Sequence, residues 1–334
     1  MIDIGNAQII GQRDNQEDYF ASIEINNGML SVVADGMGGY EGGEVASTLS
    51  VKSFIDYFKT NFTPVSIASL LIEAVHFANS KLEQEKNDNP SLDEMGCTFV
   101  ATYTIDSNLY WVSVGDSVLY RYSHTKLIRL NANHSVAGDY QIEVDAGRMT
   151  QEDANSKPNR HALTSALTGY EIPHIEQSQI EISESDRFII ASDGIHTLED
   201  QKIEHLASRQ NDNQELADSI VRLIEKKNLK NQDNTTVITL QLMQQENQTK
   251  KHASKSYRTS YLILIIVILL AIIGFLVYTN YADAIKDKLF ANDANETKVM
   301  LEKDLNVSET NTTDVVVDVN QTDKNKKENN ETSK

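Results

Sequence analysis

The sequence predicts an α+β domain in which antiparallel β-sheets are covered by amphipathic helices. Strand-like runs rich in β-branched and aromatic residues come mostly in adjacent pairs, which favours antiparallel sheets over a doubly wound parallel sheet. Helical periodicity is confined to a few long segments between these runs. All of this patterning lies within residues 1–242 of the 334-residue chain, which is long enough for a large core.

The strands are short, rich in β-branched and aromatic residues, and often end at a glycine or an aspartate. We expect them at residues 7–10, 19–25, 29–34, 98–105, 109–114, 119–122, 188–191 and 237–242. Apolar residues recur at helical spacing in three segments, 43–59, 66–84 and 213–227. Residues 134–158 are polar and weakly patterned, and we expect them to form a surface excursion.

Composition excludes several functional classes. The net charge of -19, without any Lys/Arg-rich stripe, argues against binding to nucleic acid. Cys97 is the only cysteine, which excludes an internal disulfide and every Cys-based zinc or iron–sulfur site. The first thirty residues lack a charged start followed by an apolar core, so we expect no cleavable signal peptide.

A membrane anchor is predicted near the carboxyl end. Residues 261–278 are uncharged and apolar, span a bilayer core as a helix, and begin and end with tyrosine. A buried core helix is the alternative, but the segment has no polar face. The KKHASKSYR before this run is more basic than the NYADAIKD after it, which places the amino-terminal part in the cytoplasm. The predicted order is a domain at 1–242, a polar and basic linker at 243–259, a transmembrane helix at 260–279 and an extracytoplasmic, largely disordered tail at 280–334.

Four aspartates stand next to predicted strands. Asp35, Asp116 and Asp193 each follow an apolar run, and Asp233 opens the segment that leads into the last strand. An unpartnered buried carboxylate is costly, and one metal ion can partner several of them. Carboxylates without His or Cys suit hard cations such as Mg²⁺ or Mn²⁺. The sequence therefore predicts a shared divalent-cation site.

The segment GQRDNQEDYF adds Arg13, Glu17 and Asp18 just before a strand. Taken alone, this segment is typical of a charged edge strand. Taken with the aspartates, it supplies more carboxylates and a guanidinium whose planar fork suits phosphate oxygens. Two ions that share a carboxylate can activate water and stabilise both ends of a phosphoryl displacement.

The motifs occur in the order RDNQED, ADGMGG, GCTFVATY, VGDS, NHS, PNRHALTSALTG, ASDG and QDNTT. Each is weak alone, because Asp-Gly is a common turn dipeptide, but the ordered set is specific. Over residues 5–242 the chain resembles the protein phosphatase 2C family of metal-dependent protein serine/threonine phosphatases, in its bacterial form. The resemblance implies two antiparallel sheets packed as a sandwich with helices on both outer faces, a four-layer α-β-β-α arrangement.

The resemblance also implies a set of metal ligands. Asp35 is expected to bridge two ions, Mg²⁺ or Mn²⁺. Glu17 and the Gly36 carbonyl are expected to serve the second ion, while Asp193 and Asp233 hold the first.

Three further residues have other implied roles. Asp116 matches a position that helps to hold an additional, more weakly bound metal in bacterial relatives. Asp18 is expected to orient metal-bound water, and Arg13 to bind the substrate phosphate. The implied reaction is hydrolysis of phosphoserine or phosphothreonine on a protein by metal-activated water, without a covalent phosphoenzyme. The expected partners are phosphoprotein substrates, including a serine/threonine kinase or its targets, at the inner face of the cytoplasmic membrane.

The chain departs from the family pattern at three positions. In the GDSR motif Val118 replaces the arginine, which puts a local ion pair in doubt but does not affect any metal ligand. In the TRALG motif Ser165 replaces another arginine. Met37 stands where animal relatives have a histidine, so a general acid at that position is excluded. Residues around 134–160 correspond to the variable flap beside the active site.

Other polar groups have structural interpretations. We expect His134 to make a structural hydrogen bond, Cys97 to be a small core residue, and Ser192 not to act as a nucleophile, because no G-x-S-x-G motif surrounds it. Four histidines have no ligand spacing and are expected mostly on the surface: His76, His161, His174 and His196. Two alternatives stay open. One is an inactive phosphatase-like module that binds phosphoproteins, and the other is a receptor whose outer tail regulates the enzyme.

Overall fold

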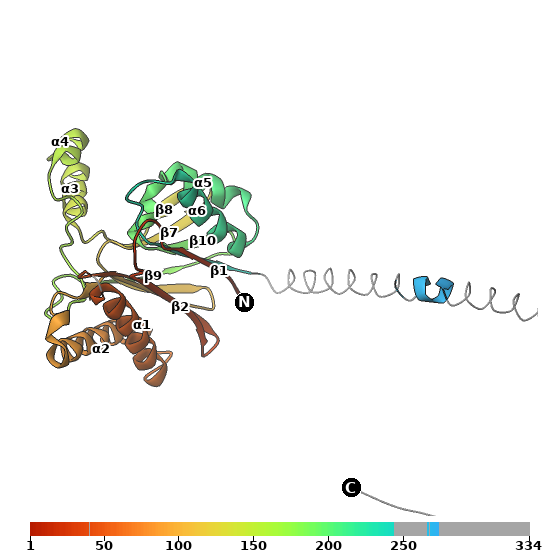
Figure 1. Ribbon diagram of the computed structural model, residues 1–334, viewed down its shortest axis with the longest axis horizontal. Coiled ribbons are helices and arrows are strands. Elements are labelled where there is room, and N and C mark those ends of the chain that lie inside the picture. Colours follow the sequence, from red (N-terminus) through yellow and green to blue (C-terminus); the bar gives the residue numbers. More distant parts are fainter. Residues whose placement is uncertain (40, 244–265, 267, 274–334) are drawn as a thin grey trace, which may run out of the picture. The chain divides into compact units, whose positions relative to one another are not determined.

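The computed structural model describes residues 1–39, 41–243, 266 and 268–273 (Figure 1). The chain divides into two compact units, residues 1–252 and 253–334. The described residues of the second unit are helical and apolar, and side chains such as Ile266 and Leu270 are exposed.

Within the described residues, no helix has both the length and the apolar character needed to cross a membrane. Most of the predicted membrane helix at 260–279 lies outside the described residues. The predicted tail at 280–334 lies wholly outside them, and so does the predicted linker at 243–259 apart from Met243.

The first unit is built on two antiparallel sheets. One has the strand order β1-β11-β10-β7-β8. Its strands are β1 (Ile2–Ile9), β7 (Val118–Ser123), β8 (Lys126–Arg129), β10 (Arg187–Ala191) and β11 (Thr235–Leu242). The other sheet has the order β2-β3-β5-β6-β9, and a short β4 pairs with the end of β3. Its strands are β2 (Asp18–Ile25), β3 (Gly28–Met37), β4 (Gly96–Cys97), β5 (Phe99–Ile105), β6 (Asn108–Val114) and β9 (Glu176–Glu181).

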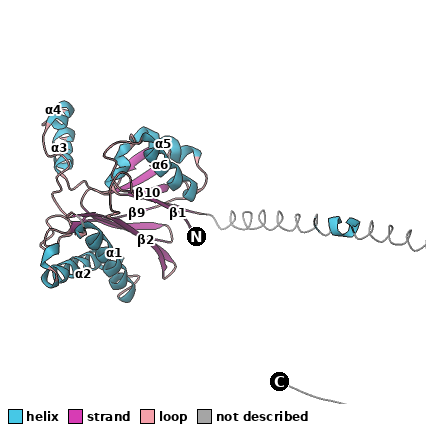
Figure 2. Ribbon diagram, viewed as in Figure 1, coloured by secondary structure: helices cyan, strands magenta, loops and turns pink. Residues whose placement is uncertain are grey.

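Helices cover the outer face of each sheet, so the predicted α+β sandwich is confirmed (Figure 2). Helices α1 (Gly42–Thr60) and α2 (Ile67–Asp88) share one apolar cluster with β3 and β5. Helices α5 (Asp200–Arg209) and α6 (Asn213–Lys227) share another with β10. A third cluster lies between the two sheets and joins residues such as Val33, Trp111 and Ile238.

Side-chain alternation explains the continuous apolar strands. In β10, Phe188 and Ile190 face the other sheet, whereas Ile189 packs with the cluster under α5 and α6. Because successive residues point to opposite faces, a strand covered on both faces has no position that faces solvent. In β3, Val33 faces the other sheet while Val32 packs towards α1 and α2.

The predicted helices are close to those observed, since α6 matches its range and α2 extends four residues past the predicted end. Residues 134–158 form the expected surface excursion (Figure 1), but they contain two helices that the weak patterning did not predict, α3 (Val136–Asp145) and α4 (Gln151–Ser156). Their N-caps are Ser135 and Thr150, whose hydroxyls accept main-chain N–H groups. Figure 1 shows the pair projecting from the body as a lobe, so little of it is buried and its sequence has no strong apolar face.

Several other elements were missed or placed differently. Strand β9 is a polar edge strand, and β1 begins at Ile2 rather than residue 7. Helix α5 is short and buries only Ile203 and Ala207, and β8 is an edge strand. The short 3-10 helices η1 (Pro90–Leu92) and η2 (Asp193–Thr197) complete the described secondary structure. Such elements have too few apolar positions to produce a clear periodicity.

Strand register brings the predicted site residues to one end of the sandwich. Asp18 at the start of β2 lies opposite Asp35 near the end of β3. Ala191 pairs with Val237, so Asp193 after β10 and Asp233 before β11 lie at the same edge of the first sheet. Antiparallel pairing therefore gathers acidic residues that are far apart in the chain.

An ion pair between a partly exposed arginine and a buried aspartate supports this framework just before β10. The Arg121 guanidinium donates to Asp186 Oδ2 at 2.7 Å, and the Ser183 N–H donates to the same atom at 2.8 Å. Burial raises the pKa of Asp186, but hydrogen bonds from Arg121, Ser123 and Ser183 outweigh it and hold the pKa at about 2. The carboxylate therefore stabilises the fold above its unfolded pKa near 4, and this contribution is lost as the pH falls towards 2.

We expect Asp186→Asn to lower the free energy of unfolding by about 2 kcal/mol at neutral pH. The difference from the wild type should shrink between about pH 5 and pH 2, because the wild-type carboxylate then becomes protonated. Denaturant unfolding over this pH range measures the effect. A deficit that stays constant over the range would contradict this role.

Candidate functional site

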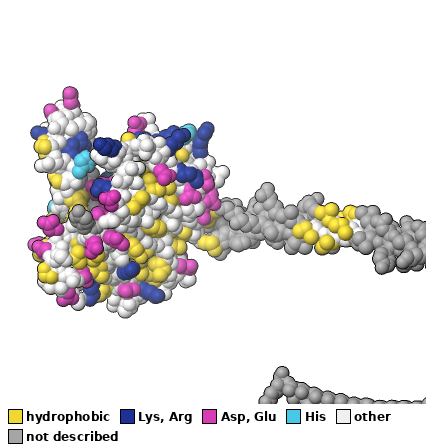
Figure 3. Space-filling model, in the orientation of Figure 1, with side chains coloured by type: hydrophobic (Ala, Val, Ile, Leu, Met, Phe, Trp, Pro, Cys, Tyr) yellow, Lys and Arg dark blue, Asp and Glu magenta, His cyan; other side chains and the backbone are white. Residues whose placement is uncertain are grey.

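A cavity of about 710 Å³ opens where β3 and β10 end and β11 begins. Six predicted side chains line it: Arg13, Glu17, Asp35, Asp116, Asp193 and Asp233. Gly36 also lines the cavity, whereas Asp18 is buried behind its wall. Figure 3 shows Asp and Glu side chains around the recess between the projecting lobe and the body of the domain. The structure thus brings all the predicted site residues to one place.

Asp35 occupies the centre of this acidic group. Its main-chain N–H donates to Thr98 Oγ1 at 3.2 Å, and the Thr98 N–H donates back to the Asp35 carbonyl at 2.8 Å. Burial, with the negative charges of Asp18 and Asp193 next, raises the pKa of Asp35 well above its ordinary value. Its carboxyl group can hydrogen-bond to Asp18 and to Asp193 when one member of each pair is protonated.

Asp18 is held from behind by hydroxyl groups. Its Oδ2 accepts hydrogen bonds from Ser192 Oγ at 2.7 Å and from Thr236 Oγ1 at 2.8 Å. Its Oδ1 is buried and has no hydrogen-bond partner within the described part of the chain. Burial raises the pKa of Asp18 to about 6, against the opposing effect of these two hydroxyls. The unpartnered oxygen has the burial and charge expected beside a cation.

Asp193 and Asp116 continue the acidic wall. Burial, together with Asp116 and Asp233, raises the pKa of Asp193 to about 7. Burial also raises the pKa of Asp116, and the positive charge of Arg129 opposes that rise. Arg129 Nη2 donates to the Asp116 carbonyl at 2.9 Å. This arginine on β8, which sequence reasoning missed, places a guanidinium beside the loop where the family arginine is replaced by Val118.

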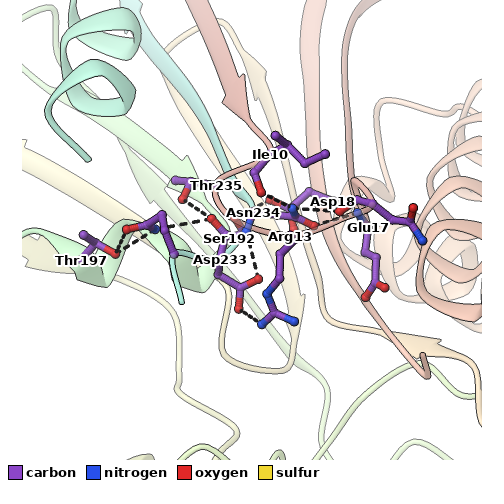
Figure 4. Close-up of polar contacts among 11 residues, drawn as sticks. Ile10, Arg13, Glu17, Asp18, Ser192, Thr197, Asp233, Asn234 and Thr235 are labelled. Atoms are coloured by element: carbon purple, nitrogen blue, oxygen red, sulfur yellow. Dashed lines mark hydrogen bonds and ion pairs between the residues drawn. The ribbon is translucent and has the colours of Figure 1, made fainter. Parts of the chain in front are cut away.

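Arg13 and Asp233 form the rim of the pocket. Arg13 Nη2 lies 2.6 Å from Asp233 Oδ2, and both side chains are about half exposed (Figure 4). The guanidinium predicted to bind phosphate is therefore paired with one of the predicted metal ligands. An exposed pair of this kind is worth little free energy, so the arginine can exchange partners readily.

Asn234 joins the two acidic segments and was missed by sequence reasoning. Its Oδ1 accepts the Glu17 N–H at 2.8 Å, and its Nδ2 donates to the Ile10 carbonyl at 2.7 Å and the Asn15 carbonyl at 3.1 Å (Figure 4). The side chain thereby fixes the segment with Arg13 and Glu17 against the start of β11. Its place in the DNTT motif was the available signal.

Glycines allow the main chain to pack closely beside Glu17. A Cβ on Gly36 would lie 2.1 Å from the Gly43 carbonyl oxygen. A Cβ on Gly43 would lie 2.6 Å from Glu17 Oε2. The Glu17 carboxylate therefore rests against the first turn of α1, where the helix dipole favours a negative charge.

The donor set fits hard divalent cations. Several buried or half-buried carboxylates face one pocket. Their pKa values are raised by burial first and by the charges of neighbouring carboxylates second, and bound cations oppose both effects. Among the described residues, however, no group of three or more His, Cys, Asp or Glu side chains has the arrangement of a finished ion site. Asp233 turns to Arg13, and Asp35 approaches its acidic neighbours. The individual metal-ligand assignments stay predictions.

The structural interpretation of His134 is confirmed, because its Nδ1 accepts the Gly115 N–H at 3.2 Å. Cys97 is fully buried, and burial raises the pKa of its thiol to about 12, as expected for an inert core residue. The Ser192 hydroxyl donates a hydrogen bond to Asp18, which is a structural role and agrees with the expectation that Ser192 is not a nucleophile. His161 is exposed as expected, but it also lines the acidic pocket, which its spacing in the sequence did not indicate.

Residues 4–232 match the family model described as protein phosphatase 2C. The chain belongs to this family. It is 30% identical to the serine/threonine protein phosphatase PstP of Mycobacterium tuberculosis over 182 residues, which is 54% of this chain and 34% of that protein. The alignment thus spans about a third of the length of this relative.

Solved structures of this family superpose on the chain. A crystal structure of the Mycobacterium tuberculosis phosphatase PstP/Ppp matches with a TM-score of 0.64 and 28% identity, covering 73% of this chain and 99% of that one. A catalytic domain of PstP in complex with two manganese ions matches with a TM-score of 0.63 and 26% identity, over 73% and 99% of the two chains.

Substituting Gly43 by alanine tests the packing around Glu17. The new Cβ would displace the Glu17 carboxylate, so we expect the Mn²⁺ concentration for half-maximal phosphatase activity to rise about tenfold or more. The matched control is Gly42→Ala, because the nearest atoms to its new Cβ would belong to Met95, the first of them at 3.3 Å. Equal Mn²⁺ requirements in the two variants would show that the Glu17 position does not matter.

Proposed function

We propose that this chain is a metal-dependent protein serine/threonine phosphatase that hydrolyses phosphoserine and phosphothreonine on protein substrates. The observation that supports this most directly is the convergence of Asp35, Asp116, Asp193 and Asp233 on one pocket. These residues come from separate segments of the chain, and their shared edge has no structural need for four carboxylates. Membership of the protein phosphatase 2C family supports the same reaction.

The pocket is suited to two divalent ions, Mn²⁺ or Mg²⁺. Bound ions supply Lewis acidity that activates water and neutralises phosphoryl charge. Asp35 lines this pocket together with Glu17 and Asp193, and it is the residue that would be shared between two ions. The PstP structure with two manganese ions supports this number. We assign Asp116 to a further, weaker site, because it lines the same pocket near Arg129.

The protein's own residues act on water and phosphate. Asp18 is fixed by Ser192 and Thr236, so its remaining oxygen can hold a water in one orientation. Arg13 can leave Asp233 to bind phosphate oxygens at the rim. The Met37 thioether cannot donate a proton, so the leaving oxygen takes its proton from water in the pocket.

Two side chains that could form a phosphoenzyme, those of Cys97 and Ser192, are poorly placed. The Cys97 thiol is fully buried, with its pKa raised by burial to about 12. The Ser192 hydroxyl is fully buried and donates to Asp18. Direct attack by water is therefore the pathway that the site favours.

We expect Asp193→Asn to reduce Mn²⁺-dependent hydrolysis of p-nitrophenyl phosphate at least about a hundredfold. In metal-free buffer the variant should melt at the wild-type temperature or above it, because the substitution removes a charge that its neighbours repel. Asp106→Asn, in the exposed β5–β6 turn, is the matched control. Excess chelator should abolish wild-type turnover.

The same assay separates this proposal from an inactive phosphoprotein-binding module. Such a module would bind phosphopeptides without releasing phosphate at any Mn²⁺ or Mg²⁺ concentration. Full activity of Asp193→Asn, or activity in excess chelator, would overturn the metal-dependent mechanism.

We also propose that the segment at 260–279 anchors the chain in the cytoplasmic membrane, with the catalytic domain in the cytoplasm. The support is the uncharged apolar run at 261–278 and the basic stretch before it. Tethering would raise the local concentration of the phosphatase around membrane-bound kinases and their targets. A tail that senses a ligand is less well supported, because residues 306–334 contain few apolar side chains.

For the full-length chain we expect the membrane fraction to retain the protein after carbonate extraction. Replacing both Leu269 and Leu270 by arginine should release it, because two charges at the centre of the run make insertion unfavourable by several kcal/mol. Both side chains are exposed, so the substitutions disturb no packing in the described structure. Recovery of the unaltered chain in the soluble fraction would contradict the anchor.

A further inference from the structure

A second hollow adjoins the catalytic pocket. It has a volume of about 800 Å³ and lies between α3 of the projecting lobe and the segment that enters β9. Thr164 and Pro173 line both this groove and the catalytic pocket. The two spaces are therefore adjacent, and a chain whose phosphoresidue occupies the pocket can extend over these shared residues into the groove.

One side of α3 forms a wall of the groove. Asp139, Ile142 and Asp145 line it at intervals of three residues, which keeps them on one side of a helix. The base of the helix is attached to the body, since the Val136 N–H donates to the Ala162 carbonyl and the Ala137 N–H to the Arg160 carbonyl. The wall is thus fixed where it meets the catalytic pocket.

The opposite wall is formed by Pro173, Ile175 and Glu176. Glu176 Oε2 accepts hydrogen bonds from Ser113 Oγ, at 3.3 Å, and from the Ala132 N–H. The groove therefore combines apolar side chains with a row of carboxylates. Ile142 is 61% exposed, so its side chain can be covered by a ligand in the groove.

The groove has an excess of negative charge. Against Asp139, Asp145 and Glu176 it contains one guanidinium, Arg129, which is turned inwards and donates to the main-chain carbonyls of residues 116, 117, 131 and 132. Burial lowers the pKa of His134, which favours its neutral form. Within the described residues neither Asp139 nor Asp145 forms an ion pair. Asp145 Oδ1 accepts a hydrogen bond from Gln141 Nε2 at 2.9 Å, which leaves its charge uncompensated. The negative charges of both carboxylates are therefore available to a cationic ligand.

We propose that this groove binds the polypeptide on one side of the phosphoresidue and selects substrates with arginine or lysine interleaved with apolar residues there. The inference rests on the proposed phosphatase function and names its substrate class. An extended peptide advances about 3.3 Å per residue with alternating side chains. It can therefore direct basic side chains to Asp139 and Asp145 while apolar ones contact Ile142 and Ile175. Opposite charges across such a surface determine specificity more than affinity.

The test uses the full-length chain with Mn²⁺ and phosphothreonine peptides of one length. In each peptide, three residues on one side of the phosphothreonine are Arg-Leu-Arg, Gln-Leu-Gln or Glu-Leu-Glu. One set of peptides carries them before the phosphothreonine and a second set carries them after it. The readout is the ratio of kcat/KM for the basic peptide to kcat/KM for the acidic peptide. Because both values come from the same protein, any general change in catalytic rate cancels.

We expect a ratio of about ten or more when the charges lie on one side of the phosphothreonine, and a ratio near one when they lie on the other. The double variant Asp139→Asn/Asp145→Asn should lower that ratio about fivefold. The control Glu152→Gln/Glu181→Gln changes the net charge equally at exposed residues outside the groove and should keep the ratio. Raising the salt to about 0.5 M should lower the wild-type ratio.

A wild-type ratio near one or below one on both sides would overturn the proposal. So would a double variant whose ratio falls no further than that of the control. These failures differ from failure of the phosphatase function, in which neither the peptides nor p-nitrophenyl phosphate would be hydrolysed with Mn²⁺ or Mg²⁺.

Discussion

Repulsion among carboxylates held close together is the constraint on which this structure depends. Asp18, Asp35 and Asp193 approach one another at the ends of strands, and their pKa values are raised by burial and by one another. Such an arrangement opposes folding unless other interactions hold the segments in place. The apolar clusters between the sheets and under the helices supply that stabilisation, since they anchor the strands that carry these residues.

The register of the strands determines how the acidic residues are placed in the site. The β2–β3 ladder sets Asp18 opposite Asp35, and a slip of one residue would turn either side chain to the other face. Neutral side chains then orient the acids. Thr98 holds the main chain of Asp35, Ser192 donates to Asp18, and Asn234 fixes the segment that bears Glu17. The acids thus meet in one pocket while their supports come from the strands and loops around them.

Catalysis and substrate selection belong to different parts of the fold. The acidic pocket lies on strand ends of the rigid sandwich, whereas the adjoining groove takes one wall from the projecting lobe. Few residues of α3 and α4 are buried, so the chemistry of this wall can vary without loss of core packing. Asp139 lies in the first turn of α3 and Asp145 accepts a hydrogen bond from Gln141, so both support the helix itself. With Ile142 they also share the groove that they face.

The sequence by itself determined the composition of the site and the class of fold. The spacing of apolar residues in the sequence indicates long amphipathic helices and buried strands, so α1, α2, α6 and the buried strands could be predicted. The acidic residues at the strand ends could be predicted as well. Elements with few buried residues could not, because α3, α4, β8 and β9 have too little apolar patterning. Only the tertiary structure decided that Arg13 pairs with Asp233, that Arg129 supports Asp116, and that a second groove joins the pocket. These features depend on distances between segments that are far apart in the chain, and no local pattern of residues encodes such distances.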